Sequence, residues 1–126
     1  MVAPRRNIRF LLSGAAGAIA LSVSAGAFAV GTTDVDASAA VKLAKKSNCL
    51  RCHGIEKKKE GPSYAFLAAR YEGKPDAEEK LFKHITSGNL VKLTDGHKEN
   101  HKVVRSMDPD EIRNLVKWIL AQGQDD

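Results

Sequence analysis

The sequence predicts an all-α domain behind an N-terminal export segment. Between residues 37 and 120, apolar side chains recur at the three- and four-residue spacing of amphipathic helices. No stretch alternates apolar and polar residues as a half-buried strand does, and the last segment carries strong helix-start signals. With 126 residues, the chain is long enough for one domain and too short for two.

The predicted domain is poor in large apolar side chains. After residue 30, its only aromatic residues are Tyr64, Phe66, Tyr71, Phe82 and Trp118. A domain of this size buries a modest share of its surface and is marginally stable. A large apolar cofactor at its centre would supply the missing core.

The first 29 residues have the features of a signal peptide. These are a basic start at Arg5, Arg6 and Arg9, an apolar run over residues 10–30, and the small-x-small pattern Ala27-Phe28-Ala29. The run is nearly long enough to span a bilayer, but it is rich in Ala, Gly and Ser rather than Leu and Phe. We therefore expect residues 1–29 to be removed and residues 30–126 to form the mature domain, although Ala27 and Ala39 also end small-x-small triplets.

Export predicts a periplasmic protein with no stable membrane insertion after cleavage. Removing residues 1–29 takes away three arginines and no acidic residue, which leaves 17 basic and 15 acidic side chains. A net charge this close to zero gives no reason to expect a nucleic-acid partner.

Four segments are expected to be regular helices. The first covers residues 37–48 and is capped by Asp36; the second covers residues 64–71, with Phe66 and Leu67 inward; the third covers residues 76–87, with an apolar stripe of Leu81, Phe82 and Ile85. The last helix follows the cap Asp108, with Pro109 at its first position and Glu111 placed for a capping box. Its apolar face consists of Ile112, Leu115, Val116, Ile119 and Leu120. Residues 89–107 show no period. A loop of that length in a small domain is uncommon and usually functional.

The motif Cys49-Leu50-Arg51-Cys52-His53 predicts a covalently attached haem. Residues three apart share one face of a helical turn, so both thiols can reach the two vinyl groups along one haem edge. His53 follows directly and can place its imidazole under the iron as the proximal ligand. Export supports this prediction, because covalent haem attachment in bacteria takes place outside the cytoplasm.

Other uses of the cysteine pair fit less well. A structural zinc site needs four ligands, usually in two separated pairs, and the chain has only two cysteines. A thioredoxin-type dithiol normally starts a helix after a strand, and the sequence shows no βαβ pattern. A disulfide across three residues would cross-link almost nothing.

The chain resembles the class I c-type cytochromes, and their small bacterial members in particular. The resemblance rests on the helix that ends in Asn48 before the motif, on Gly61-Pro62-Ser63 and on the segment Leu115-Val116-Lys117-Trp118-Ile119-Leu120. It implies four to five helices wrapped around one haem c, with the first and last helices crossing beside it. It also implies that the Pro62 carbonyl accepts a hydrogen bond from His53 and that Trp118 packs near the helix crossing.

The distal iron ligand departs from the family pattern. Most class I cytochromes place a methionine shortly before the last helix, whereas the only methionine here besides Met1 is Met107. Met107 directly precedes the cap Asp108, where it is expected to pack against Ile112 as a hydrophobic staple.

Histidines take the place of that methionine. His101 lies close to the expected position, and the run Glu99-Asn100-His101-Lys102 is similar to a subset of class I proteins with bis-histidine iron. We expect His101 to be the distal ligand, with His97 and Met107 as alternatives. His84, on the flank of an apolar stripe, is expected to be an ordinary surface histidine.

Together these residues predict a mono-haem electron carrier that is not an enzyme. Two protein ligands leave no iron position for a substrate, so electrons would pass to and from redox partner proteins through the haem edge. We expect the carrier to be a monomer. Lysines on both sides of the motif would steer acidic partners; they are Lys42, Lys45, Lys46, Lys57, Lys58 and Lys59. The alternatives are a haem subunit docked on a larger oxidoreductase, and a haem enzyme or gas-binding protein with an open distal site.

Overall fold

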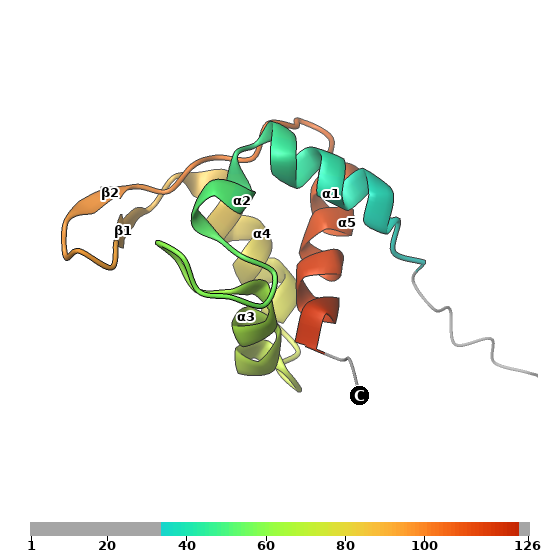
Figure 1. The fold of residues 1–126 in the computed structure, drawn as a ribbon. Coiled ribbons are helices and arrows are strands. Elements are labelled where there is room, and N and C mark those ends of the chain that lie inside the picture. The colour runs from blue at the N-terminus through green and yellow to red at the C-terminus, as the bar shows by residue number, and fades with distance from the viewer. Residues whose placement is uncertain (1–33, 124–126) are drawn as a thin grey trace, which may run out of the picture. The chain divides into compact units, whose positions relative to one another are not determined.

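The computed structural model describes residues 34–123, and this part of the chain is mostly helical (Figure 1). Its elements are, in chain order, α1 (Ala37–Lys46), α2 (Cys49–Cys52), α3 (Tyr64–Tyr71), α4 (Ala77–Ser87), β1 (Leu90–Lys92), β2 (Lys98–Asn100), α5 (Pro109–Leu120) and the 3₁₀ turn η1 (Ala121–Gly123). None of the helices in this range is both long and apolar enough to cross a membrane. The predicted signal peptide, residues 1–29, lies outside the described residues.

Helix α1 lies across α5, which brings the first and last α-helices of the described domain together (Figure 1). The Asp36 carboxylate caps α1 by accepting a hydrogen bond from the Ala39 N–H at 2.8 Å. The Asn114 side chain makes two hydrogen bonds to the backbone of Asp36. Its Oδ1 accepts from the Asp36 N–H at 2.9 Å, and its Nδ2 donates to the Asp36 carbonyl at 2.9 Å. One side chain of α5 thus fixes the start of α1.

Helix α5 is the centre of the core, because α1, α3 and α4 all pack against it. Its buried side chains are Ile112, Leu115, Val116, Trp118 and Ile119, on the face that the sequence predicts. Leu115 and Val116 are each only 1 % exposed. Leu81 and Ile85 of α4 join this core, whereas Phe82 is only partly buried against it.

The segment 89–107 contains a small hairpin that the sequence does not predict. Strands β1 and β2 pair antiparallel, with Val91 opposite Glu99. The connecting turn closes with the Gly96 N–H donating to the Leu93 carbonyl at 3.0 Å, and Gly96 has a φ of +92° that favours glycine. Each strand has three residues, which is too short to show an alternating pattern.

Two expectations for side chains outside the core are wrong. Met107 is 97 % exposed, so it forms no staple with Ile112. Phe66 is 56 % exposed, because α3 turns Tyr64 and Ala68 inward instead.

The start of α5 also differs in detail from the predicted capping box. The Asp108 N–H donates to the Ser106 hydroxyl oxygen at 3.1 Å, and that hydroxyl donates to the Glu111 carboxylate at 2.6 Å. Glu111 therefore acts on the cap through Ser106 rather than directly. Asp108 itself caps the helix as expected, accepting from the Asp110 N–H at 2.9 Å.

Candidate functional site

The cysteine motif forms its own short helical turn. Helix α1 ends at Lys46, two residues before the predicted end, because Asn48 takes a left-handed conformation with a φ of +60°. The chain is thereby redirected into α2, which carries Cys49 and Cys52 as free, partly buried thiols. Their spacing of three places both sulfurs on one face of the turn.

His53 ends this turn and is held from two sides. Its backbone N–H donates to the Cys49 carbonyl at 3.0 Å. Its ring Nδ1 lies 2.7 Å from the Pro62 carbonyl oxygen, and a carbonyl can only accept, so Nδ1 carries the proton. The lone pair of the ring therefore lies on Nε2, which is left free for a metal.

Gly61 allows the His53 ring to lie against the backbone. A Cβ atom at this position would come within 2.7 Å of Cε1 and 3.0 Å of Nδ1 of that ring. The Gly61 N–H also donates to the Cys52 carbonyl at 2.8 Å, which ties this loop to the cysteine turn.

Gly61→Ala is expected to push the His53 ring off the Pro62 carbonyl. We expect a loss of about 1–3 kcal/mol in the free energy of unfolding, because the added methyl overpacks the ring, together with a lower haem content. Denaturant unfolding and an absorbance assay of haem per polypeptide measure the two effects. Gly73→Ala is the control for haem content: no atom lies within 4 Å of its Cβ, so its haem content should stay at the wild-type value, while its left-handed φ of +68° lowers stability.

Buried aromatic rings connect the cysteine turn to α5. The Tyr64 ring stacks on His53 with centroids 5.5 Å apart and meets Trp118 edge-on at 5.6 Å. Burial raises the pKa of the Cys49 thiol, and a hydrogen bond with the Tyr64 hydroxyl partly offsets that rise. Tyr64 thus connects His53 of the motif to Trp118 of α5.

His101 faces His53 from the segment that follows β2. Its backbone N–H donates to the Asn89 carbonyl at 2.9 Å, and the Val104 N–H donates to the Ile85 carbonyl at 2.9 Å. These two bonds fasten the segment to the C-terminal end of α4. Desolvation by burial, with smaller effects of His84 and His53, lowers the pKa of His101 to about 4, so the ring is uncharged at neutral pH.

The two facing imidazoles fit an iron atom between them. Their ring centroids are 6.0 Å apart, with an interplanar angle of 52°. Two metal–nitrogen bonds of about 2 Å, plus about 1 Å from each nitrogen to its ring centre, give about 6 Å. The Nδ1 atom of His101 is buried and makes no hydrogen bond to the described residues. Nε2 is therefore the nitrogen of His101 that is open to a ligand.

His84 is the residue that sequence reasoning missed. Its ring centroid lies 4.3 Å from that of His101, so it belongs to the histidine cluster and is not an ordinary surface residue. Burial lowers the pKa of His84, and His53 lowers it further. Its position three residues after Leu81, a core residue, was the available signal, because such residues share a helix face.

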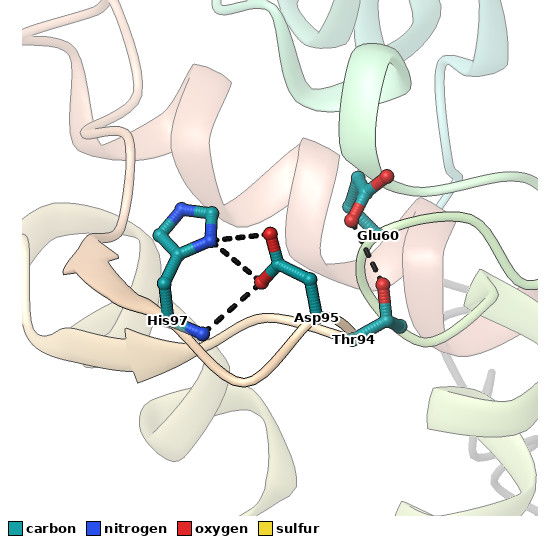
Figure 2. Close-up of polar contacts among 4 residues, drawn as sticks. All are labelled: Glu60, Thr94, Asp95 and His97. Atoms are coloured by element: carbon teal, nitrogen blue, oxygen red, sulfur yellow. Dashed lines mark hydrogen bonds and ion pairs between the residues drawn. The ribbon is translucent and has the colours of Figure 1, made fainter.

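Figure 2 shows that His97 lies in the hairpin turn and pairs with Asp95. The His97 Nδ1 atom is 2.6 Å from both carboxylate oxygens, and Asp95 also accepts from the His97 backbone N–H at 3.1 Å. These bonds hold the pKa of Asp95 below its usual range. Figure 2 also shows the Thr94 hydroxyl donating to Glu60 at 2.9 Å, which ties the hairpin to the loop after the motif. His97 and Met107 are both exposed, and neither is brought against His53.

A groove of about 300 Å³ runs beside Cys52 between the cysteine turn and the hairpin. It is lined by Asn48, Arg51, Cys52, Glu60, Leu93, Asp95, His97, Glu99 and Lys102. A larger hollow of about 550 Å³ lies between α3, α4 and α5, and no cysteine or histidine lines it. Across residues 34–123, no three His, Cys, Asp or Glu side chains are placed to hold a bare metal ion. Cys49, Cys52, His53 and His101 thus offer two thiols and two imidazoles to a haem.

Comparison with known proteins agrees with this geometry. The sequence model of the Cytochrome c family matches residues 37–122, so the chain belongs to that family. It is a class I c-type cytochrome that carries one covalently bound haem c and transfers electrons, as its curated relatives do. The predicted fold class, cofactor and electron-carrier role are confirmed.

Curated relatives and solved structures support the assignment. The chain is 35 % identical over 85 residues to cytochrome c2 of Rhodocyclus tenuis, covering 67 % of this chain and 92 % of that protein. It is 43 % identical over 80 residues to cytochrome c-552 of Hydrogenobacter thermophilus, covering 64 % of this chain and 78 % of that protein. It is similar to the crystal structure of the class 1 cytochrome MtoD from Sideroxydans lithotrophicus, with 49 % identity and a TM-score of 0.70. The match covers 72 % of this chain and 100 % of MtoD. The crystal structure of Nitrosomonas europaea cytochrome c552 is similar at 33 % identity and a TM-score of 0.52. This match covers 65 % of this chain and 98 % of that protein.

Proposed function

We propose that Cys49 and Cys52 form the two thioether bonds to the haem and that His53 and His101 are its axial ligands. Pro62 holds the proximal ring through the hydrogen bond at His53 Nδ1. The observation that carries this proposal is the distance of 6.0 Å between the His53 and His101 rings, which suits an iron between two imidazoles. The uncharged state of His101 supports it, because only a neutral imidazole has a lone pair for a metal.

Two imidazole ligands have consequences for the function. The bound haem supplies one-electron chemistry, and the ligands decide what else can reach its iron. With both axial positions filled by protein, there is no vacancy for oxygen, peroxide or a substrate. A second imidazole in place of a thioether also favours ferric iron and lowers the reduction potential. The proposed function is therefore outer-sphere electron transfer between redox partners.

We further propose that residues 1–29 direct export and are removed, so that the mature carrier works in the periplasm as a monomer. The basic start, the apolar run and the cleavage pattern at Ala29 support this. Haem attachment outside the cytoplasm requires the same route.

The optical and electron paramagnetic resonance spectra of the purified protein in both redox states test the ligand assignment. We expect low-spin spectra of bis-imidazole type, no methionine–iron charge-transfer band, and no carbon monoxide binding to the reduced protein. A charge-transfer band of that kind would point to Met107 instead. Rapid carbon monoxide binding would point to an open distal site and to the enzyme or sensor alternative.

Exposed lysines beside the cysteine turn support docking of acidic partners. The backbones of Lys58 and His53 pair in an isolated antiparallel β-bridge, which places Lys58 beside the motif. Lys57 and Lys58 are both exposed. Lys59 is bound to the Leu50 carbonyl at 2.7 Å and so has a structural role as well.

Reversing the charges of Lys57 and Lys58 is expected to slow encounter with negatively charged reagents. For Lys57→Glu/Lys58→Glu, we expect the rate of oxidation by ferricyanide to fall about tenfold at low salt, because steering is lost. The difference from wild type should disappear at high ionic strength. Arg70→Glu/Lys74→Glu is the matched control with the same change in charge. Equal effects of the two double variants would show that net charge, and not this surface, sets the rate.

A further inference from the structure

The distal imidazole has a buried nitrogen without a partner. Nδ1 of His101 is buried and makes no hydrogen bond within residues 34–123, although the Lys102 backbone acts on the ring and raises its pKa slightly. If Nε2 binds the iron, the neutral ring carries its proton on Nδ1, which is then a buried donor. A buried donor nearly always has an acceptor, and a metal-bound histidine almost always donates its second N–H. The proximal ring satisfies this rule at Pro62, whereas the distal ring does not.

His84 is the polar side chain placed to meet this need. Its ring centroid lies 4.3 Å from that of His101, with an angle of 51° between the rings, so the rings are in contact. His84 is in the last turn of α4, and the segment carrying His101 is fastened to that same helix end by the bond between Val104 and Ile85. The two rings are therefore held together by the backbone on both sides. An N–H···N hydrogen bond of about 2.9 Å between two imidazoles places their ring centres about 5 Å apart, so the contact at 4.3 Å becomes such a bond after a small shift of the partly buried His84 side chain.

We propose that His84 is a positioning residue for the distal ligand, accepting a hydrogen bond from Nδ1–H of His101 and fixing the orientation of its ring. This inference rests on the proposed role of His101 as the distal ligand. A neutral imidazole has one nitrogen lone pair that can accept this bond. Accepting this bond increases the electron-donating strength of the His101 ring and so stabilises ferric iron.

The test compares replacements of His84 in the haem-loaded protein at pH 8. His84→Phe keeps a ring against His101 but removes the acceptor, whereas His84→Asn restores an acceptor on a smaller side chain. His97→Phe is the matched control, because His97 lies in the hairpin turn and pairs with Asp95. The measurements are the redox equilibrium against a mediator of fixed potential, the low-spin spectrum, and the solvent-exchange rate of the His101 Nδ1 proton by nuclear magnetic resonance.

We expect His84→Phe to stay low-spin while its redox equilibrium shifts about tenfold toward the ferrous state. The His101 Nδ1 proton should exchange faster, and His84→Asn should recover much of both effects. If His84→Phe acted only by packing less well, the variant would lose haem or stability, and His84→Asn would not restore the wild-type behaviour. A wild-type equilibrium and exchange rate in His84→Phe would overturn the proposal.

Failure of this inference can be told apart from failure of the ligand assignment. If His101→Ala becomes high-spin while His84→Phe behaves as wild type, only the role of His84 is wrong. If His101→Ala keeps the wild-type low-spin spectrum, His101 is not the ligand, and the inference fails with it.

Discussion

His101→Ala is expected to convert the protein from six-coordinate low-spin to high-spin haem. The reason is that the His101 ring, 6.0 Å from the His53 ring, is the only imidazole that we place on the iron opposite His53. Its removal leaves the distal position to water or to an added ligand. If the lost bond is worth about 3 kcal/mol, the apparent affinity of the reduced protein for carbon monoxide rises about 100-fold. Absorbance spectra and a carbon monoxide titration measure both effects.

The two alternative ligands provide the controls for this experiment. Met107 is 97 % exposed, and His97 is paired with Asp95 in the hairpin turn. Met107→Ala and His97→Ala should therefore keep the wild-type spectrum and resist carbon monoxide. A high-spin spectrum in either control, with His101→Ala unchanged, would contradict the assignment.

Cys49→Ala/Cys52→Ala is expected to abolish covalent haem attachment entirely, because the chain has no other cysteine. Any haem retained through His53 and His101 should be extracted by acidified organic solvent. We also expect the free energy of unfolding to fall by about 3–5 kcal/mol, the cost of removing a large aromatic group from a core. The small core explains this dependence, because a domain of this size is marginally stable without its cofactor.

The single variants Cys49→Ala and Cys52→Ala separate the two tethers. Each should keep one thioether bond and therefore retain haem through extraction, in lower yield. Haem that resists extraction from the double variant would mean that another residue holds it.

Local patterns made the attachment site predictable from the sequence. The five residues of the motif are contiguous, so a single helical turn decides how Cys49, Cys52 and His53 lie relative to one another. Helix α5 was equally clear, because Asp108 and Pro109 mark its start and the period of its apolar residues marks its buried face.

Features that depend on contacts between distant segments could not be predicted in this way. His84 meets His101 only because Val104 pairs with the end of α4, and no local pattern encodes that pairing. The hairpin strands are too short to show a period. Met107 occupies a staple position in sequence but points away from the core, since Ser106 and Glu111 order the start of α5 without it.

Mass spectrometry of the exported protein, combined with thiol titration, tests the central claim most directly. The account predicts a polypeptide that is heavier by one haem and has no titratable thiol, because both sulfurs are alkylated by the porphyrin. An unmodified polypeptide with two reactive thiols would contradict it.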